Sequence, residues 1–561
     1  MTTPQTETAG ADRAETAGAD RAEATGADRA EATGADRAEA TGADGPEIAG
    51  ADRAEATGAD GAQAVRSAIA AARRGNDPSR WPEKLPVADR LAALLDPGTW
   101  LEDGLLANAS ADGLPADGVR TGVGRIDGRK VAVIAHDFAV KAGSWGRLTC
   151  EKQVRILERA DRDLLPVIYL VDSAGGRLTD QLGFFSDRRG AARIFGLQIA
   201  LSGRVPQICC LLGPSAAGGA YMPAFTDWVG MVEGNASMYL ASPRVAEKVT
   251  GERTTLEEMG GALMHATVSG CGDEVFNSDW EAIAAARLLL SYLPDSWEQR
   301  PPAAAPAEPA RSDWTDVIPA AESAGYDVGE VIDRLVDAGS FFEIKPRWAQ
   351  EIVVGLGRLN GQVVGIVANQ SQVRSGAIFV DSADKAARFI TMCDAFNVPL
   401  IFLHDVPGFM VGVAVERQGI IRHGAKMITA MASAEVPKFS VILRKSYAAG
   451  YYAMCAPGFG PRASIALPTA SVGPMAAEAS ANAMYAKKIA EIDDPERRAA
   501  YVSARIAEQR GDINLLRLAS ELVVDSIVEP EALRAELIAR LHDAEHWTRG
   551  PQRRHHHISP V

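Results

Sequence analysis

The feature that most constrains the fold of this chain is a pattern that occurs twice along it. Residues 122–138 read GVGRIDGRKVAVIAHDF and residues 355–371 read GLGRLNGQVVGIVANQS, so both contain the frame G-x-G-R-[IL]-[DN]-G-x-x-V. A frame of this length is hard to obtain twice by chance. Because internal self-similarity marks repeated structural units, the sequence predicts that two parts of the chain share one fold.

The same order of elements follows each copy of the frame. An amphipathic helix is predicted at 149–163 and again at 381–397, and a short apolar strand follows each, in LPVIYLVDSAGG and VPLIFLHDVPGF. A second helix and strand then lead to a turn rich in Gly and Ala, in VPQICCLLGPSAAGGAY and VPKFSVILRKSYAAGYY. Apolar strands that alternate with helices are typical of a mostly parallel sheet covered by helices. We therefore expect an α/β protein with two similar domains.

Two segments of biased composition set the predicted domain boundaries. Residues 11–58 repeat every eight residues, as ADRAEATG and close variants with a Gly in each unit. A helix there would bury almost nothing and would meet a Gly, which costs about 1 kcal/mol relative to Ala, every two turns. We therefore expect a disordered acidic tail over 1–64. PPAAAPAEPAR at 301–311 has the composition of an exposed linker. The predicted domains are an N-terminal domain at 65–305 and a C-terminal domain at 312–550.

Much of the negative charge lies in the tail. The net charge is −15, of which residues 1–64 carry −9 from 14 acidic side chains and five Arg. This distribution gives no basic surface typical of nucleic-acid binding. No apolar run reaches the roughly 18–20 residues that span a bilayer, and the N-terminus does not read as a secretory signal. We expect a cytoplasmic protein that binds neither nucleic acid nor membrane.

The Gly-rich turns lie at predicted strand ends, where ligands of open α/β sheets bind. They are Ala174-Gly175-Gly176, Ala217-Gly218-Gly219-Ala220 and Ala448-Ala449-Gly450. Small side chains let a ligand approach the backbone, and a turn that opens a helix directs unpaired N–H groups at that ligand. Such a turn suits an oxyanion, including a thioester enolate, and suits a phosphate almost as well. One Gly-Gly turn alone would favour tight packing, but two copies at equivalent positions favour binding.

Few side chains show a catalytic pattern. The sequence has no GxSxG elbow and no GxxxxGK[ST] phosphate loop. His404 and His423 could be catalytic, but a structural role is favoured for both. Asp172 and Asp405 end matching strands, where acid/base work is possible and capping of the next turn is favoured. His555-His556-His557 are expected to be a mobile chain end rather than a metal tract. The six cysteines form no metal-binding set and are expected to be buried reduced thiols, so no metal site is predicted.

These motifs, taken in order through both parts, resemble the β, or carboxyltransferase, subunits of propionyl-CoA and methylcrotonyl-CoA carboxylases. The resemblance covers about residues 65–550, and its most specific stretch is DVPGFMVG…ERQGIIRHGAKMITA…VPKFSVILRKSYAAGYYAM at 405–454. SAAGGAYMPA at 215–224 and IYLVDSAGG at 168–176 support it in the first part. The resemblance implies a duplicated crotonase-like fold, a superhelix of β-β-α units. It places acyl-CoA in the N-terminal domain and biotin in the C-terminal domain of another chain, usually in a hexamer.

The resemblance also implies the reaction. A carboxyl group moves from carboxybiotin to the α (or vinylogous) carbon of an acyl-CoA, and biotin takes up the α-proton, so no side-chain base is needed. The resemblance also implies that biotin carboxylase and the biotin carboxyl carrier belong to partner chains. The sequence contains no Met-Lys carrier motif of its own, since Lys426-Met427 has the reverse order and lies in a predicted helix. Negative charge would develop on both reactants, and two oxyanion holes would stabilise it.

Matching motif positions assign these roles to particular residues. The oxyanion donors would be backbone N–H groups of Gly218, Gly219 and Ala220 on the acyl-CoA side, and of Ala449 and Gly450 on the biotin side. Segment Ala174-Gly175-Gly176-Arg177 would lie along CoA. The biotin pocket would be lined by Pro407, Gly408, Phe409, Tyr451 and Tyr452.

The chain departs from the family pattern at the second turn. Propionyl-type enzymes usually have Gly-Gly-Ala where this chain has Ala448-Ala449-Gly450, and often have an Asp tied to substrate choice where it has Tyr452. We therefore hypothesise an acyl group larger or more unusual than propionyl. The alternatives are a biotin-dependent decarboxylase subunit, a non-catalytic CoA-binding or scaffold protein, and a crotonase-type hydratase or isomerase.

Overall fold

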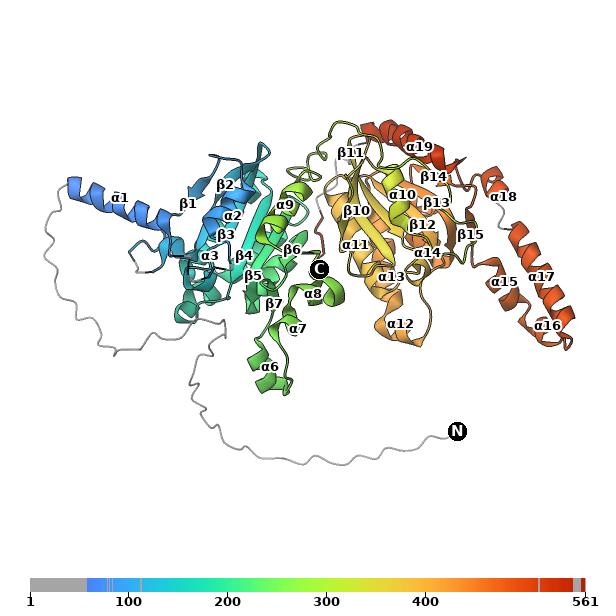
Figure 1. The fold of residues 1–561 in the computed structure, drawn as a ribbon, viewed down its shortest axis with the longest axis horizontal. Coiled ribbons are helices and arrows are strands. Elements are labelled where there is room, and N and C mark those ends of the chain that lie inside the picture. The colour runs from blue at the N-terminus through green and yellow to red at the C-terminus, as the bar shows by residue number, and fades with distance from the viewer. Residues whose placement is uncertain are drawn as a thin grey trace, which may run out of the picture. The chain divides into compact units, whose positions relative to one another are not determined.

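The computed structural model describes residues 58–77, 79, 81–82, 84–110, 113–512, 515–547 and 556–559 (Figure 1). The predicted tail lies, as far as residue 57, outside the described residues. Helix α1 begins at Gly58 and ends at Arg74, so its first seven residues fall within the segment assigned to the tail and correct the prediction of disorder there. No helix in the described part of the chain is long and apolar enough to cross a membrane.

Two eight-stranded sheets have the same topology. The first has the strand order β1-β2-β3-β4-β5-β6-β8, with β7 beside β5, and the second has β16-β14-β13-β12-β11-β10-β9, with β15 beside β13. Each strand of the second sheet therefore matches the strand eight places earlier, as the predicted duplication requires. We call the part of the chain built on the first sheet the N-half and the part built on the second sheet the C-half.

The strands of the N-half are β1 Leu101–Asp103, β2 Val119–Ile126, β3 Arg129–His136, β4 Val167–Ser173, β5 Gln207–Ala216, β6 Trp228–Val232, β7 Ser237–Tyr239 and β8 Glu274–Phe276. Those of the C-half are β9 Phe342–Ile344, β10 Ile352–Leu359, β11 Gln362–Asn369, β12 Leu400–Val406, β13 Lys438–Tyr447, β14 Ala463–Ala466, β15 Ser471–Gly473 and β16 Ser526–Ile527.

The duplicated frame folds as a hairpin at the start of each sheet. Strands β2 and β3 pair antiparallel, as do β10 and β11. Their two-residue turns are Asp127-Gly128 and Asn360-Gly361, and all four residues have positive φ, as type I′ turns require. The strands that follow pair in parallel from β3 to β6 and from β11 to β14, so a mostly parallel sheet is confirmed.

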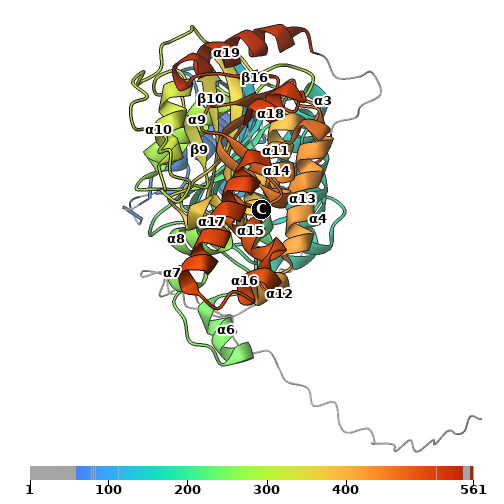
Figure 2. The same ribbon diagram turned by 90° about the vertical axis from the view of Figure 1, so that its right-hand side faces the viewer.

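Helices cover both faces of each sheet. In the N-half, α3 (Arg147–Asp163) and α4 (Ala191–Leu201) share one core with the sheet, and α2 (Val87–Leu94) and α9 (Asp279–Leu290) belong to another. The C-half counterparts are α11 (Val380–Ala395), α13 (Ile420–Ser433), α10 (Val328–Leu335) and α19 (Pro530–Asp543). Figure 2 shows α11 and α13 side by side. The predicted helices at 149–163 and 381–397 are confirmed as α3 and α11, whose ends lie within two residues of the predicted ones.

One apolar core continues from the N-half into the C-half. It joins α2, α9 and their face of the first sheet to α11, α13 and their face of the second sheet. Trp228 and Tyr292 of the N-half pack against Phe342 of the C-half, with ring centroids 6.1 and 6.3 Å apart. The Arg388 guanidinium of α11 donates to the carbonyl oxygens of Thr226 (2.7 Å) and Asp227 (3.0 Å).

The C-terminal residues 556–559 correct the prediction of a mobile chain end; His555 itself lies outside the described residues. The Ile558 side chain is 5% exposed and belongs to the continuous core. The Ile558 N–H donates to Ser202 Oγ (3.0 Å), and this hydroxyl donates back to the Ile558 carbonyl (3.2 Å). His556 Nε2 lies 2.7 Å from Asp394 Oδ2 of α11. Because the segment is mostly polar, its composition gave no sign that Ile558 would be buried and hold it in place.

Candidate active site

Two equivalent turns follow the central strands β5 and β13. Strand β5 ends at Ala216 and leads into a 3₁₀ turn at Ala217–Ala220, whereas β13 ends at Tyr447 and leads into α14 (Ala448–Ala453). Ala217 and Ala448 both have φ of 52°, a left-handed conformation that costs an alanine about 1–2 kcal/mol. Strain repeated at equivalent positions points to a functional demand on the backbone.

The register of the two turns identifies their matching residues. Ala217 and Gly218 are exposed and Gly219 is buried; Ala448 and Ala449 are exposed and Gly450 is buried. Gly218 thus matches Ala449, and Gly219 matches Gly450. The first N–H groups of a helical turn lack an acceptor within the turn. The predicted donors Gly218, Gly219 and Ala220 therefore lie together in the N-half, and Ala449 and Gly450 lie together in the C-half.

A second pair of equivalent segments lies beside these turns. The N–H of Trp145 donates to the Gly175 carbonyl (2.8 Å), and the N–H of Ile378 donates to the Gly408 carbonyl (3.0 Å). Gly175 and Gly408 therefore match, and both have positive φ, 92° and 133°. A Cβ on Gly175 would lie 3.0 Å from the Ala216 carbonyl oxygen. Segment 174–177, predicted to bind CoA, thus lies beside the N-half turn.

The C-half segment is packed still more closely against its turn. A Cβ on Gly450 would lie 2.9 Å from Gly408 Cα and 2.8 Å from Val406 Cγ2, and one on Gly408 would lie 3.5 Å from Ala448 Cβ. Pro407, Gly408 and Phe409, predicted to line the biotin pocket, therefore lie beside Ala449 and Gly450. The predicted site residues form two groups, one in each half.

Three predicted binding side chains differ in how freely they can meet a ligand. Arg177 donates to Asp117 Oδ1 (2.8 Å) and to the Ser144 carbonyl, and its side chain is 12% exposed. Burial, with smaller effects from Tyr452 and Cys455, raises the pKa of Tyr451 to about 12, so its hydroxyl stays protonated at neutral pH. Tyr452 is 54% exposed beside the C-half turn.

The histidines singled out from the sequence have structural partners. His404 is fully buried between Ser440 and Ser446, whose hydroxyls lie 3.0 and 2.9 Å from its ring nitrogens. Burial lowers the pKa of His404 to about 3, which keeps the ring neutral. His423 Nδ1 lies 2.7 Å from Asp384 Oδ2, a carboxylate that Lys426 also binds. These contacts agree with the structural roles favoured for both histidines.

The cysteines give no sign of a shared site. Five of the six are buried, Cys271 is partly exposed, and all six are free thiols. Among the residues that the structure describes, no three His, Cys, Asp or Glu side chains are grouped so as to hold a metal ion.

The strand-end carboxylates are held by buried cations, a feature that the sequence analysis missed. Asp172 accepts from Lys84 (2.9 Å) and from Arg90 (3.0 Å), which also binds Asp279 (2.7 Å). We call Asp172, Lys84 and Arg90 the N-clamp. Both carboxylate oxygens of Asp172 are occupied by these cations, so the favoured capping role is wrong for this residue.

The C-half contains a matching set, which we call the C-clamp. Asp405 accepts from Arg444 (2.9 Å) and Lys445 (3.1 Å), and both Asp405 and Arg444 are fully buried. A run such as VILRKSY, in which two cations interrupt an apolar strand, was the signal that could have revealed them. Lys84 and Arg90 precede the first sheet and gave no such signal.

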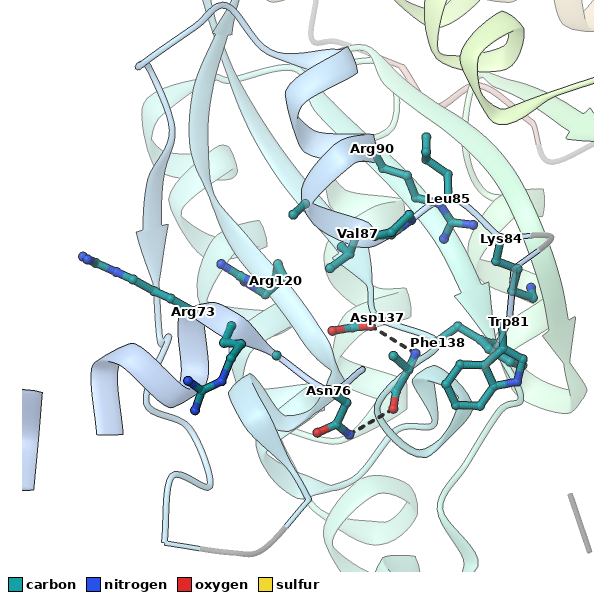
Figure 3. Close-up of a pocket in the computed structure, with 15 residues that line it drawn as sticks. Arg73, Asn76, Trp81, Lys84, Leu85, Val87, Arg90, Arg120, Asp137 and Phe138 are labelled. Atoms are coloured by element: carbon teal, nitrogen blue, oxygen red, sulfur yellow. Dashed lines mark hydrogen bonds between the residues drawn. The ribbon is translucent and has the colours of Figure 1, made fainter. Parts of the chain in front are cut away.

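The two halves differ in access to the clamps. Lys84 and Arg90 line a cavity of about 80 Å³ together with Trp81, Phe138 and Asp137 (Figure 3). The Lys84 ammonium lies 4.1 Å from the centre of the Phe138 ring, and its side chain is 12% exposed. In the C-clamp, the side chain of Lys445 is 7% exposed and that of Arg444 is fully buried.

The chain is similar to known proteins both in sequence and in structure. The chain matches the family model described as the carboxyl transferase domain over residues 82–558. It is 54% identical over 472 residues to the Bacillus subtilis uncharacterized carboxylase YngE, covering 84% of this chain and 92% of that protein. It is 38% identical over 469 residues to the propionyl-CoA carboxylase carboxyltransferase subunit of Haloferax mediterranei, covering 82% and 90%. The solved structure of transcarboxylase 12S, a hexamer assembly with methylmalonyl-CoA bound, is similar with a TM-score of 0.84 at 35% identity, covering 90% and 99%.

Proposed function

The chain belongs to the carboxyl transferase family, and from that premise we propose that its two turns serve the two substrates of one transfer, with carboxybiotin as donor. The protein is an acyl-CoA carboxyltransferase with a duplicated crotonase-like fold. The observation that carries the proposal is the pair of strained turns, Ala217 and Ala448, at equivalent strand ends. Two substrates that both develop negative charge on oxygen need two sets of N–H donors.

The N-half turn is proposed to hold the acyl-CoA. The N–H groups of Gly218, Gly219 and Ala220 would donate to the thioester oxygen as charge develops there, and segment 174–177 would lie along the CoA chain. Gly218 has no atom within 4 Å of the position of a Cβ, so a ligand can approach its backbone. Backbone donors of this kind need no reorganisation during the reaction.

The C-half turn is proposed to hold biotin. Gly450 packs against Gly408 with no room for a Cβ, which holds the two segments together, and Ala449 is exposed beside them. A ureido oxygen of biotin would accept from the N–H groups of Ala449 and Gly450. When bound, carboxybiotin supplies the carboxyl group and then a base for the α-proton. In this transfer the bond from the biotin nitrogen to the carboxyl carbon and the Cα–H bond of the ester would break, the Cα–carboxyl bond would form, and the proton would end on biotin. No side chain of this chain is required to act as the base, which accords with the neutral, buried His404.

We also propose that a second copy of the chain completes the site, as part of a hexamer. Large apolar side chains near the turns are exposed in both halves: Leu182 (80%) and Phe185 (72%) in the N-half, and Val411 (77%) and Ile421 (75%) in the C-half. Exposed apolar patches of this kind mark interaction surfaces. The N-half of one copy on the C-half of another would cover both patches and join the two groups of site residues.

The test is to purify the full chain with its partners and assay it. We expect a biotinylated protein to co-purify, and the complex to carboxylate a CoA ester in the presence of ATP and bicarbonate. Native mass spectrometry should give six copies of the chain. A complex that contains the biotinylated partner and carboxylates no ester in a panel from acetyl-CoA to long-chain acyl-CoA would overturn the proposal.

A further inference from the structure

We propose that the N-clamp and the C-clamp are positioning groups, each of which sets the binding of one substrate. The inference rests on the proposed function, because it assigns acyl-CoA to the N-half and biotin to the C-half. It adds that Lys84 and Lys445, which line neither turn, control the two Michaelis constants separately.

The N-clamp fixes the base of the N-half site. Asp172 lies where the register between β4 and β5 shifts, one residue before Ser173. A Cβ on Gly213 of β5 would lie 1.9 Å from Asp172 Oδ1, and one on Gly143 would lie 2.2 Å from the Asp172 carbonyl oxygen. Asp172 is therefore held between a loop, which contacts its backbone, and the strand that ends in the N-half turn, which contacts its carboxylate.

Hydrogen bonds link the position of Asp172 to segment 174–177, which is proposed to lie along CoA. The Ser173 hydroxyl donates to the Gly143 carbonyl (2.8 Å), and the Gly175 N–H donates to Ser173 Oγ (3.2 Å). Ser173 also pairs with Ser215, near the end of β5. A shift of Asp172 would therefore move Gly175 relative to Ala216.

The C-clamp has the same position under the biotin side. Asp405 lies where the register between β12 and β13 shifts, and a Cβ on Gly376 would lie 2.7 Å from its carbonyl oxygen. The next residue, Val406, is the side chain against which Gly450 packs. Asp405 is thus one residue from the cradle formed by Gly408 and Gly450.

Each Asp is bound by two cations, and in the N-clamp Arg90 also binds Asp279. A buried carboxylate that loses a partner must move towards another donor or take up a proton. A displacement of about 1 Å at a site of this kind is enough to cost a large factor in rate. Removing the lysine from either clamp leaves its arginine in place, so the carboxylate keeps one partner and the fold is preserved while the segment above it relaxes.

The experiment compares Lys84→Met with Lys445→Met in the full-length chain. Biotin-dependent decarboxylation is measured with free biotin and a panel of α-carboxyacyl-CoA esters that includes methylmalonyl-CoA, and the fastest ester is used for kinetics. We expect Lys84→Met to raise the KM for the ester about tenfold and leave the KM for biotin within about twofold. Lys445→Met should have the opposite effect.

Matched variants separate positioning from loss of structure. Lys84→Arg and Lys445→Arg keep the charge and should restore the KM that each Met variant raises. Lys130→Met removes an exposed lysine of the N-half and should change neither KM. If a Met variant fails to assemble, Lys84→Gln or Lys445→Gln, which still donates a hydrogen bond, provides the same comparison.

Two results have different meanings. Equal changes in both KM values, or a lower kcat with both KM values unchanged, would overturn the positioning role. A wild-type chain that decarboxylates no ester in a biotin-dependent manner would instead overturn the proposed function.

Discussion

The N-half and the C-half each bury an Asp at the equivalent strand end, but different elements supply the cations that bind it. In the N-half, the cations Lys84 and Arg90 come from the segment and helix before the sheet, and the strand supplies only Asp172. In the C-half, β13 supplies Arg444 and Lys445, and the segment before α10 supplies carbonyl groups of Pro319 and Ala321, to which Arg444 donates. Duplication has therefore kept an Asp with two cations at the strand end, but different elements supply those cations.

This difference also affects how exposed each clamp is. The carboxylate and the guanidinium are buried in both clamps, but Lys84 borders a cavity with its side chain 12% exposed, whereas the side chain of Lys445 is 7% exposed. Loss of one partner from a buried ion pair destabilises a protein far more than loss of one partner from a solvent-exposed ion pair. Loss of a fully buried arginine should therefore destabilise the protein more than loss of Lys84, which lies at the edge of the cavity.

The largest expected effect is on stability. Arg444→Met leaves Asp405 buried with Lys445 alone, and we expect it to lower the free energy of unfolding by about 3–5 kcal/mol. Lys84→Met, at the edge of the cavity, should cost less. Urea unfolding followed by circular dichroism measures both, and Lys130→Met provides the surface control. A loss for Arg444→Met no larger than that for Lys84→Met would contradict the expected effect of the difference in burial between these two side chains.

The next effect is on rate and concerns the N-half turn. Gly219→Pro removes a proposed oxyanion donor, because proline has no N–H. We expect kcat to fall by about 10²–10³ while the hexamer and its melting temperature are preserved. Steady-state assays with the biotinylated partner measure this. Unchanged turnover in an intact assembly would remove Gly219 from the donor set.

A smaller effect should distinguish Gly450 from Gly218, two glycines that occupy neighbouring rather than matching positions of the two turns. Gly450→Ala places a Cβ 2.9 Å from Gly408 Cα, and overpacking of this kind costs about 1–3 kcal/mol. Gly218→Ala meets nothing within 4 Å and introduces the residue that the C-half already has at Ala449. We expect a lower melting temperature and a higher KM for biotin in Gly450→Ala only. Equal behaviour of the two variants would contradict the register that matches Gly218 with Ala449.

The smallest expected effect is on choice of substrate. Tyr452 exposes half of its surface beside the C-half turn, and its N-half counterpart, Tyr221, is 45% exposed. We expect Tyr452→Asp to change the ratio of kcat/KM between propionyl-CoA and a longer CoA ester by about tenfold. Tyr221→Asp provides the matched control in the other half. A wild-type preference for acetyl-CoA or propionyl-CoA would overturn the hypothesis of a larger acyl group.

The sequence predicted those features that lie close together along the chain. The duplicated frame, the strand ends and the turns at Gly218-Gly219 and Ala449-Gly450 are local patterns, and each has a period or composition that identifies it. The N-clamp could not be predicted in this way, because Lys84 and Asp172 are 88 residues apart and both look like ordinary polar residues. The inward position of Ile558 was hidden for the same reason, since its partner Ser202 is 356 residues away.

That last contact has a consequence for how the protein is made. Ser202 and the strands around it leave the ribosome long before Ile558 is synthesised; at about 5–20 residues per second, the delay is roughly 20–70 s. During this interval, the N-half must fold with the edge of its core open and must avoid joining other nascent chains. Ile558 can therefore take its place in the core only after the strands around Ser202 have been made.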